Sequence, residues 1–281
     1  MSSYRFCRTD DIGLLVDALN CCWAPYAPGE PPITPAAFKR SIRDLQVWCS
    51  SCMVAFDGSD PIGVLIGAKR TTGTLVHTIA VHPDHVRQGH GRHLLTSLSS
   101  KLAILGPPRI VAEVPEASTA PRALFSAGGY VEEAILTDYV LEGEQIDGPD
   151  LGERLVIPVT VDDLVANGLL GTDGPQTSWE RSIETLTARK DDIDGLAVAS
   201  DERIEAYVLF MQGGEIVSLR AFVEDGGVRL KQLLSRLHAQ GMRTIRFTKV
   251  QPAEISRELL ETLGFRSVGA HVLYAGRARS D

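Results

Sequence analysis

Residues 81–95 read VHPDHVRQGHGRHLL and join an apolar strand to an amphipathic helix through a turn that contains two glycines. The leucines of the expected helix share one face: Leu94, Leu95, Leu98 and Leu102. Backbone N–H groups at a helix start lack partners and point outward with the positive end of the helix dipole, and glycines let a phosphate approach them. Arg87 and Arg92 can add charge-assisted hydrogen bonds. The stretch therefore predicts an anion-binding turn, although a Gly-x-Gly turn alone is also typical of a tight connection that binds nothing.

The segments around this turn have weak counterparts in the second half of the chain. Residues 38–42 (FKRSI) resemble residues 179–183 (WERSI), and residues 128–130 (GGY) resemble residues 263–265 (LGF). Self-similarity of this kind indicates an internal repeat. The alternative is chance similarity between two α+β domains.

Both halves predict the same order of elements when they are read by periodicity and turn residues. A short strand and two helices precede a hairpin of two strands, and then a strand, a long helix, a strand, a helix and one or two closing strands follow. We therefore expect two tandem α+β domains, residues 1–145 and 146–281. The expected linker runs from Glu142 to Glu153, where glycines and a proline stand among acidic residues.

The composition favours a globular protein, with 44% hydrophobic and 23% charged residues. No apolar run approaches the roughly 20 residues that cross a bilayer, and the first residues, MSSYR, lack the pattern of a secretion signal. The net charge is -8 at pH 7, and neither half has the excess of basic residues that phosphate-backbone binding requires. We expect a cytoplasmic protein without nucleic-acid or membrane partners, and the charge favours a cationic small molecule or basic peptide.

Cysteine and histidine clusters raise the question of a metal site. Cys49-Ser50-Ser51-Cys52 has the spacing of a metal or redox pair, and Cys21-Cys22 could complete four ligands. A free intracellular cysteine more often behaves as a small buried hydrophobe, and the apolar run after Cys52 indicates a strand entrance. Five of the seven histidines fall between His77 and His93, but a strand, a loop and a helix would scatter their rings. We therefore expect no metal site.

The turn resembles the acetyl-CoA loop of the GNAT N-acetyltransferase family. In that family a strand ending in Val-x-Pro is followed by Gln/Arg-x-x-Gly-x-Gly/Ala, and here Val81-His82-Pro83 is followed by Val86-Arg87-Gln88-Gly89-His90-Gly91. The order and spacing of the strand, the Val-x-Pro ending and both glycines match, and the resemblance covers most of residues 3–142. Val86 departs from the pattern because it lacks the side-chain donor of Gln or Arg, whereas the backbone N–H groups remain available.

The resemblance implies a three-layer α+β fold with two tandem GNAT-like domains, each a mixed, mostly antiparallel sheet flanked by helices. It implies acetyl-CoA as the cofactor, with its pyrophosphate at the glycine turn. It also implies a strand that splays from its neighbour and bonds the pantetheine arm through main-chain groups. The cofactor-binding residues expected on this basis are Ile79, Ala80, Val81, Arg87, Gln88, Gly89, His90, Gly91, Arg92, Ser118 and Phe125.

Attack by an amine needs a route for its proton, because amines are mostly protonated at neutral pH. Ala112-Glu113-Val114 resembles the Leu-Glu-Val strand that supplies the base in several family members, so Glu113 is the expected catalytic base. A solvent-facing strand position without a catalytic role is the alternative. His77 precedes Val81 by four residues and shares its strand face, which makes it a second candidate base or else a satisfied polar residue on a half-buried strand.

The tyrosine acid of the family lies about twelve residues beyond the base, where this chain has Phe125. Phenylalanine cannot donate a proton, so the thiolate must leave unaided, through water or with help from another tyrosine such as Tyr130 or Tyr139. Tyr130 is the catalytic candidate that we name. A thiol with a pKa of about 8.5 is a tolerable leaving group, so the missing acid need not abolish catalysis.

The second half lacks the features of the cofactor site. Residues 222–230 replace the loop, and Val228 and Leu230 stand at the places of the two glycines. Glu224-Asp225 adds negative charge where a pyrophosphate needs the opposite, and Thr248 falls at the position of the expected base. Two-domain GNAT proteins with one working half and one degenerate half have this layout. We expect the second half to supply a wall of the acceptor cleft and to substitute for a dimer partner.

The resemblance thus implies an N-acetyltransferase that moves an acetyl group from acetyl-CoA to a primary amine of a small molecule or peptide. A non-catalytic acyl-CoA-binding or sensor protein is the main alternative, which the departures at Val86 and Phe125 leave open. A scaffold that uses both folds for protein contacts is a third. The sequence does not specify the acceptor amine, the acyl-chain preference, or whether the protein is a monomer or a homodimer.

Overall fold

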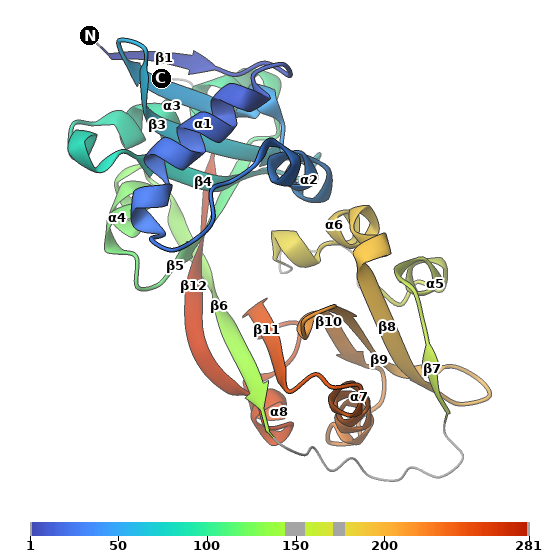
Figure 1. Ribbon diagram of the computed structural model, residues 1–281. Helices are drawn as coiled ribbons and strands as arrows, with labels where there is room; N and C mark the ends of the chain where they lie inside the picture. Colours follow the sequence, from blue (N-terminus) through green and yellow to red (C-terminus); the bar gives the residue numbers. More distant parts are fainter. Residues whose placement is uncertain (1, 144–154, 171–177, 280–281) are drawn as a thin grey trace. The chain divides into compact units, whose positions relative to one another are not determined.

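The computed structural model describes residues 2–143, 155–170 and 178–279 (Figure 1). The chain forms two compact units that are not two consecutive stretches of sequence. Unit 1 consists of Met1–Ala134 and Val272–Asp281, and unit 2 consists of Ile135–His271.

The expected linker, Glu142 to Glu153, lies outside the described residues apart from Glu142 and Gly143. The last residues of the chain, from Val272 onward, belong to unit 1, a feature that a division at residues 145 and 146 does not include. Whether the two sequence halves are independent domains stays a prediction.

Unit 1 is a sheet with helices on both faces. Its first strands are β1 (Ser2–Phe6), β2 (Met53–Asp57), β3 (Asp60–Lys69), β4 (Thr74–Val81) and β5 (Arg109–Pro115). Its helices are α1 (Ile12–Cys22), α2 (Pro35–Leu45), α3 (His90–Leu105) and α4 (Thr119–Ala127), and its 3₁₀ turns are η1 (Ala24–Tyr26), η2 (Cys49–Ser51) and η3 (Pro83–His85). Strands β1 to β4 pair antiparallel in chain order, and β4 pairs parallel with β5. The expected mixed, mostly antiparallel sheet is therefore confirmed.

Different helices cover the two faces of the unit 1 sheet. Ala55 and Leu65 pack with Leu98 of α3 in one hydrophobic core. Val54 and Val64 are fully buried and point to the other face, because successive strand residues alternate. Helix α1 contacts β3, and Figure 1 shows it in front of the strands with α3 behind them. This arrangement gives the three expected layers.

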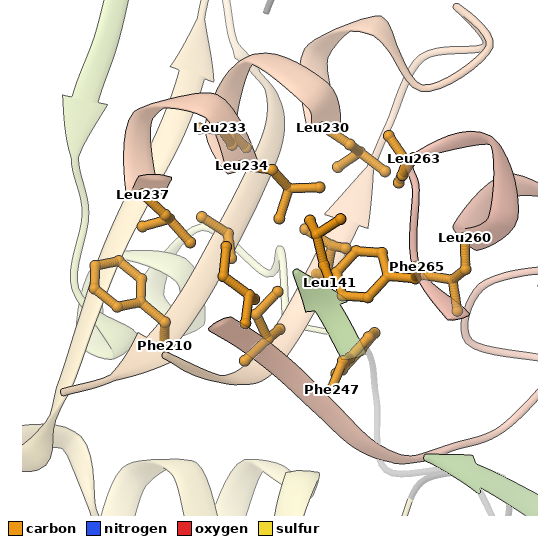
Figure 2. Packing of buried hydrophobic residues seen from close by; sticks show 14 of the residues in the cluster. Leu141, Phe210, Leu230, Leu233, Leu234, Leu237, Phe247, Leu260, Leu263 and Phe265 are labelled. Carbon is orange, nitrogen blue, oxygen red and sulfur yellow. The ribbon is translucent and has the colours of Figure 1, made fainter. Parts of the chain in front are cut away.

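Unit 2 repeats the same order of elements. Its strands are β7 (Leu155–Pro158), β8 (Ile193–Ala199), β9 (Ile204–Met211), β10 (Glu215–Ala221) and β11 (Thr244–Val250). Its helices are α5 (Val161–Ala166), α6 (Ile183–Ala188), α7 (Val228–Ala239) and α8 (Arg257–Thr262), with 3₁₀ turns η4 (Trp179–Arg181) and η5 (Lys190–Asp192). Figure 2 shows the core beneath α7, which contains Leu230, Leu233, Leu234, Leu237, Phe247, Leu260, Leu263 and Phe265. The tandem repeat expected from the sequence is thus confirmed.

Two long strands each contribute residues to both units. Strand β6 (Val131–Glu142) begins in unit 1, and its later residues pair antiparallel with β11 in unit 2. Strand β12 (Arg266–Arg277) begins in unit 2, and its residues from Val272 onward lie beside β5 in unit 1. The final strand of the polypeptide therefore completes the sheet of the first unit.

Candidate functional site

The turn before α3 has a backbone conformation that depends on glycine. Gly89 is the N-cap of α3 and has φ 89°, in the left-handed region that favours glycine. A Cβ atom at Gly89 would meet no atom within 4 Å, so the backbone conformation and not crowding requires the glycine there. Arg87 also has a positive φ, 62°, which is uncommon for a residue with a side chain. The surface above Gly89 is open.

The same turn presents a row of backbone donors. Among the described residues, no acceptor bonds the N–H groups of Arg87 through Arg92, and the helical hydrogen bonds begin with His93 N–H to Gly89 O at 3.0 Å. The first N–H groups of a helix point outward along its axis and carry the positive end of its dipole. The residues are exposed except for His90 and Gly91. The turn can therefore accept an anion without losing any internal hydrogen bond.

Strands β4 and β5 stay paired only where β4 begins. Their parallel register consists of Thr74↔Ile110 and Leu75↔Val111. Beyond Leu75 that edge of β4 has no strand partner among the described residues, although β3 stays paired with the opposite edge. The splayed strand that the resemblance implied thus has a structural counterpart.

The alternation of the β3–β4 ladder identifies the main-chain groups on this open edge. His82 donates its N–H to Ile62 O at 2.9 Å, so the N–H and C=O groups of Ile79 and Val81 point away from β3. One of them already has a partner, because the Tyr26 hydroxyl donates to Val81 O at 2.7 Å. Tyr26 lies between α1 and α2, and nothing in the local sequence identifies this contact.

His77 occupies an irregular position on β4. The β3–β4 register passes from Gly67↔Val76 to Ile66↔Thr78, so His77 is the extra residue of a β-bulge. Bulges redirect a side chain and are common beside active sites. His77 is exposed, and its Nδ1 lies 2.9 Å from Thr78 Oγ1. The bulge means that simple alternation along the strand does not place His77 relative to Val81.

Glu113 lies on β5 where that strand leaves β4. It follows the last paired residue of β5, Val111, by two positions. Ala112 and Val114 are buried in the core beneath α3 and α4, so the half-buried Glu113 side chain points to the opposite face. Glu113 therefore lies on the strand next to the open edge of β4.

The aromatic residues near α4 form a compact group. Phe125 is 1% exposed, lies edge-to-face with Tyr130 at 5.3 Å between ring centroids, and stacks on Tyr274 at 5.7 Å. The Tyr130 hydroxyl is buried and has no hydrogen-bond partner within the described ranges. Burial raises the pKa of Tyr130 to about 12. The structure places this candidate acid in the core of unit 1, so its catalytic role stays a prediction.

Tyr274 is a residue of this group that sequence reasoning missed. Its hydroxyl donates to Glu132 Oε1 at 2.7 Å, although the two residues lie 142 positions apart in the chain. Arg122 donates to Glu132 at 3.3 Å and to the Tyr274 hydroxyl at 3.4 Å. The hydrogen bonds from Tyr274 and Arg122 lower the pKa of Glu132. No local pattern could connect Tyr274 with Phe125, because β12 reaches unit 1 only through tertiary structure.

Ser118 is the N-cap residue of α4, and its side chain forms no capping hydrogen bond. Its half-exposed hydroxyl is therefore available to a ligand near the start of α4.

The clustered histidines and cysteines have other partners. His90 Nδ1 lies 2.7 Å from the Tyr4 hydroxyl, and the His93 ring lies tilted against the Tyr4 ring at 3.8 Å between centroids. Burial raises the pKa values of Cys7 and Cys22 to about 12, so these thiols stay protonated and pack as hydrophobes. Across the described ranges, no group of three or more His, Cys, Asp or Glu residues is placed to hold a metal ion. The helices of the same ranges also include none with both the length and the apolar character needed to span a bilayer.

The equivalent turn of unit 2 is filled by its own side chain. Asp225 accepts the N–H groups of Gly227 and Arg229, each at 3.0 Å, and the Arg229 guanidinium at 2.7 Å. Arg229 also pairs with Glu205 at 2.6 Å. Burial acts to raise the pKa of Asp225, but the hydrogen bonds from Arg229 and Gly227 outweigh it and hold the pKa below its ordinary value. The Asp225 carboxylate therefore occupies the place at the start of α7 where an anionic ligand would bind.

The edge of β11 is occupied as well. Strand β10 pairs with β11 only at Glu215↔Arg246. Arg181 donates to the carbonyl oxygens of Thr248 and Lys249 and pairs with Glu254 at 2.8 Å. In unit 2, Arg181 thus forms hydrogen bonds with main-chain carbonyl groups at and beside Thr248. Thr248 is the residue at the position of Glu113.

Asp225→Asn is expected to lower the free energy of unfolding by about 1–3 kcal/mol at pH 7, because it removes the charge that accepts the helix N–H groups and pairs with Arg229. The folded pKa of Asp225 lies below the unfolded value of about 3.9, so this contribution is present above that pH and is lost as the pH falls through the folded pKa. Thermal unfolding measured from pH 7 to pH 3 should show that the stability difference between the wild type and Asp225→Asn becomes smaller as the pH falls. The exposed neighbour Glu224→Gln is the control, and equal stability of both variants at pH 7 would contradict the assignment.

Comparison with solved structures identifies the fold. A putative acetyltransferase from Pyrococcus horikoshii has TM-score 0.66 and 19% identity, with coverage of 99% of this chain and 90% of that one. A tandem GNAT protein from the clavulanic acid biosynthesis pathway has TM-score 0.67 and 16% identity, with full coverage of both chains (100% and 100%). A GCN5-related N-acetyltransferase from Sphaerobacter thermophilus has TM-score 0.69 and 14% identity, with coverage of 99% and 96%. The chain is a protein of tandem GNAT fold.

Sequence comparison adds a family match to part of the chain. Residues 15–129 match the Acetyltransferase (GNAT) family, and this match lies within unit 1 and includes the glycine turn. The N-terminal part of the chain is therefore similar to the GNAT acetyltransferases, a family that in general transfers acyl groups from acetyl-CoA. No curated protein matches the sequence.

Proposed function

We propose that the protein is an acetyl-CoA-dependent N-acetyltransferase that acts on a primary amine of a small molecule or peptide. The observation that carries this proposal is the turn from Arg87 to Arg92, whose N–H groups have no acceptor among the described residues and lie at the end of the open edge of β4. Acetyl-CoA supplies an activated acyl thioester when it is bound. The residues of this chain are then needed to bind acetyl-CoA and to transfer protons.

The turn fits a diphosphate in charge and in shape. The helix dipole and the outward N–H groups favour negative charge, and the open space above Gly89 admits a phosphate to hydrogen-bond distance. Arg87 and Arg92 are exposed at the two ends of the turn and can add charge-assisted bonds. The aliphatic side chain of Val86 contributes no donor, so binding depends on the backbone.

The open edge of β4 fits an extended chain with amide groups. Ile79 and Val81 present N–H and C=O groups there, and main-chain pairing of this kind binds extended ligands irrespective of side chains. The Ala80 side chain is buried, so Ala80 helps to hold the strand in place and does not contact the ligand through its side chain. The pantetheine arm of acetyl-CoA contains the amides that this edge can bond.

Tyr26→Phe is expected to tighten acetyl-CoA binding about 2- to 10-fold, because the Tyr26 hydroxyl occupies the Val81 carbonyl that the pantetheine arm is proposed to use. Tyr26 is 51% exposed, so the loss of its hydroxyl should cost the fold little. Calorimetric titration of both proteins measures the difference. Weaker binding by the variant would instead make the hydroxyl a ligand of the cofactor.

Proton removal from the amine is assigned to Glu113. Its half-buried carboxylate points away from the core at the place where β5 leaves β4, next to the edge proposed to hold the thioester. A carboxylate there can accept the amine proton directly or through one water molecule. His77, exposed on the β4 bulge, is the second candidate for the same step.

The thiolate has no evident proton donor among the candidates. Phe125 cannot supply one, and the Tyr130 hydroxyl is buried with a pKa raised to about 12. A thiol is acidic enough to leave as a thiolate or to take its proton from water. We therefore propose a reaction without an obligatory tyrosine acid.

Two measurements on the full chain test the proposal. Calorimetry with acetyl-CoA should give one binding site per chain, because Asp225 fills the equivalent turn of unit 2. Thiol release from acetyl-CoA in the presence of a panel of small amines and basic peptides should then identify an acceptor. The absence of binding by any CoA compound would refute the proposal.

A non-catalytic acyl-CoA sensor is the second candidate function. The burial of Tyr130 and the presence of Phe125 favour it, since neither residue offers an accessible proton donor. Such a protein would bind acetyl-CoA with the same stoichiometry but release no thiol with any amine. The two functions therefore differ in turnover and not in binding.

A further inference from the structure

A cavity of about 210 Å³ lies in unit 1 between α3, the end of α4 and the last residues of β12. Three arginines line it: Arg92, Arg277 and Arg279. Thr96 and Ser99 of α3 add hydroxyl groups. No aspartate or glutamate lines it within the part of the chain that the structure describes.

No described residue supplies a counterion to the three guanidinium groups. None of them forms an ion pair or a side-chain hydrogen bond with another described residue. Some other arginines of unit 1 are paired with carboxylates, such as Arg109 with Glu133 and Arg122 with Glu132. Three like charges around one cavity repel one another, and this repulsion is strongest in a chain region without a compensating anion. All three arginines are exposed, and an anion bound in the cavity would offset their mutual repulsion.

The end of the chain is fixed against α3 at this place. Arg279 donates its N–H to Ser99 Oγ at 3.1 Å, and Ala278 donates its N–H to Pro108 O at 2.6 Å. Arg92 belongs to the first turn of α3, and Ser99 lies about 10 Å further along the helix axis. The cavity thus begins at the anion-binding turn and extends away from it.

We propose that this cavity binds a phosphate monoester, with Arg277 and Arg279 as its principal ligands. A monoester carries close to two negative charges at neutral pH and has three acceptor oxygens, which guanidinium groups bond in pairs. The ligand has two possible sources. One is the 3′-phosphate of the CoA molecule bound at the turn, and for this source the inference rests on the proposed function. The other is a separate phosphomonoester.

The test compares acetyl-CoA, 3′-dephospho-acetyl-CoA and inorganic phosphate on the full chain. The double variant Arg277→Gln/Arg279→Gln removes the two charges that the final strand contributes. Its matched control is Arg257→Gln/Arg266→Gln, which removes two exposed arginines of unit 2 that pair with Glu261 and Glu142. Calorimetry gives affinities, and thermal unfolding at constant ionic strength measures stabilisation by phosphate.

For the CoA source, wild-type protein should bind acetyl-CoA about 10- to 100-fold more tightly than the dephospho form, and the double variant should lose that difference while keeping its affinity for the dephospho form. The control variant should keep the difference. For the separate source, both CoA compounds should bind equally, and phosphate should raise the unfolding temperature of the wild type but not of the double variant. Equal CoA affinities together with no phosphate effect would overturn the proposal. If neither CoA compound binds, the proposed function fails, and the phosphate measurement still shows whether the cavity binds phosphate.

Discussion

Valine in place of Gly89 is expected to weaken acetyl-CoA binding by about 10- to 100-fold while the protein stays folded. Gly89 has φ 89°, a conformation that costs a β-branched residue about 1–3 kcal/mol. The turn should relieve this strain by rotating its backbone, which turns the N–H groups away from their common point. Each charge-assisted hydrogen bond lost in this way is worth about 1.5–3 kcal/mol. Calorimetric titration with acetyl-CoA measures the change.

Gly58→Val is the matched control for this variant. Gly58 also has a positive φ, 60°, and open space around its Cβ position, but it lies in the turn between β2 and β3. The control carries similar backbone strain and should lose stability without losing affinity. Wild-type affinity in a folded Gly89→Val protein would discredit the assignment of the turn to the pyrophosphate.

Glu113→Gln is expected to lower kcat/KM for an amine acceptor by about 10²- to 10⁴-fold at neutral pH, with little change in the dissociation constant of acetyl-CoA. Glutamine keeps the size of the side chain and removes its ability to accept a proton. The loss should shrink when the pH is raised, because more of the amine is then already deprotonated. Steady-state rates measured over a pH series, together with calorimetry, separate the catalytic effect from binding.

Glu116→Gln is the control for this second prediction. Glu116 is exposed just beyond the end of β5, so its substitution removes the same charge without touching the open edge. An unchanged rate for Glu113→Gln would transfer proton acceptance to His77 or to water. In that case His77→Gln should show the pH-dependent loss in its place.

The sequence predicted those parts of the fold that depend on local patterns. Residues 81–95 predicted a strand, a turn and a helix, and the structure confirms β4, the turn and α3 in that order. Glycine at position 89 could be read locally, because a positive φ at a helix N-cap is a property of one residue and its neighbours. The GNAT fold followed from the family resemblance of this turn, and the tandem repeat followed from the self-similarity of the two halves; both are confirmed by the solved structures.

The remaining features depend on contacts between distant residues. Tyr26 and Val81 meet through tertiary packing, and the bulge at His77 comes from a register shift against β3 that no spacing rule reveals. The excess acidity of Glu224-Asp225 was visible in the sequence. Its geometric consequence was not, since Asp225 caps the helix by folding back onto two N–H groups. The roles of individual site residues accordingly stay predictions until ligand binding is measured.

The path of β12 has a consequence for how the protein is made. Residues 1–134 emerge from the ribosome long before Val272 to Arg277, the segment that lies beside β5, is synthesised. The edge of β5 therefore stays unpaired in the nascent first unit while unit 2 is synthesised. Unpaired strand edges can pair with other chains. Pairing across so long a stretch of chain is also slow to form. A shortened gene product that stops at residue 145 should accordingly aggregate, and adding the missing segment as a peptide should restore its solubility.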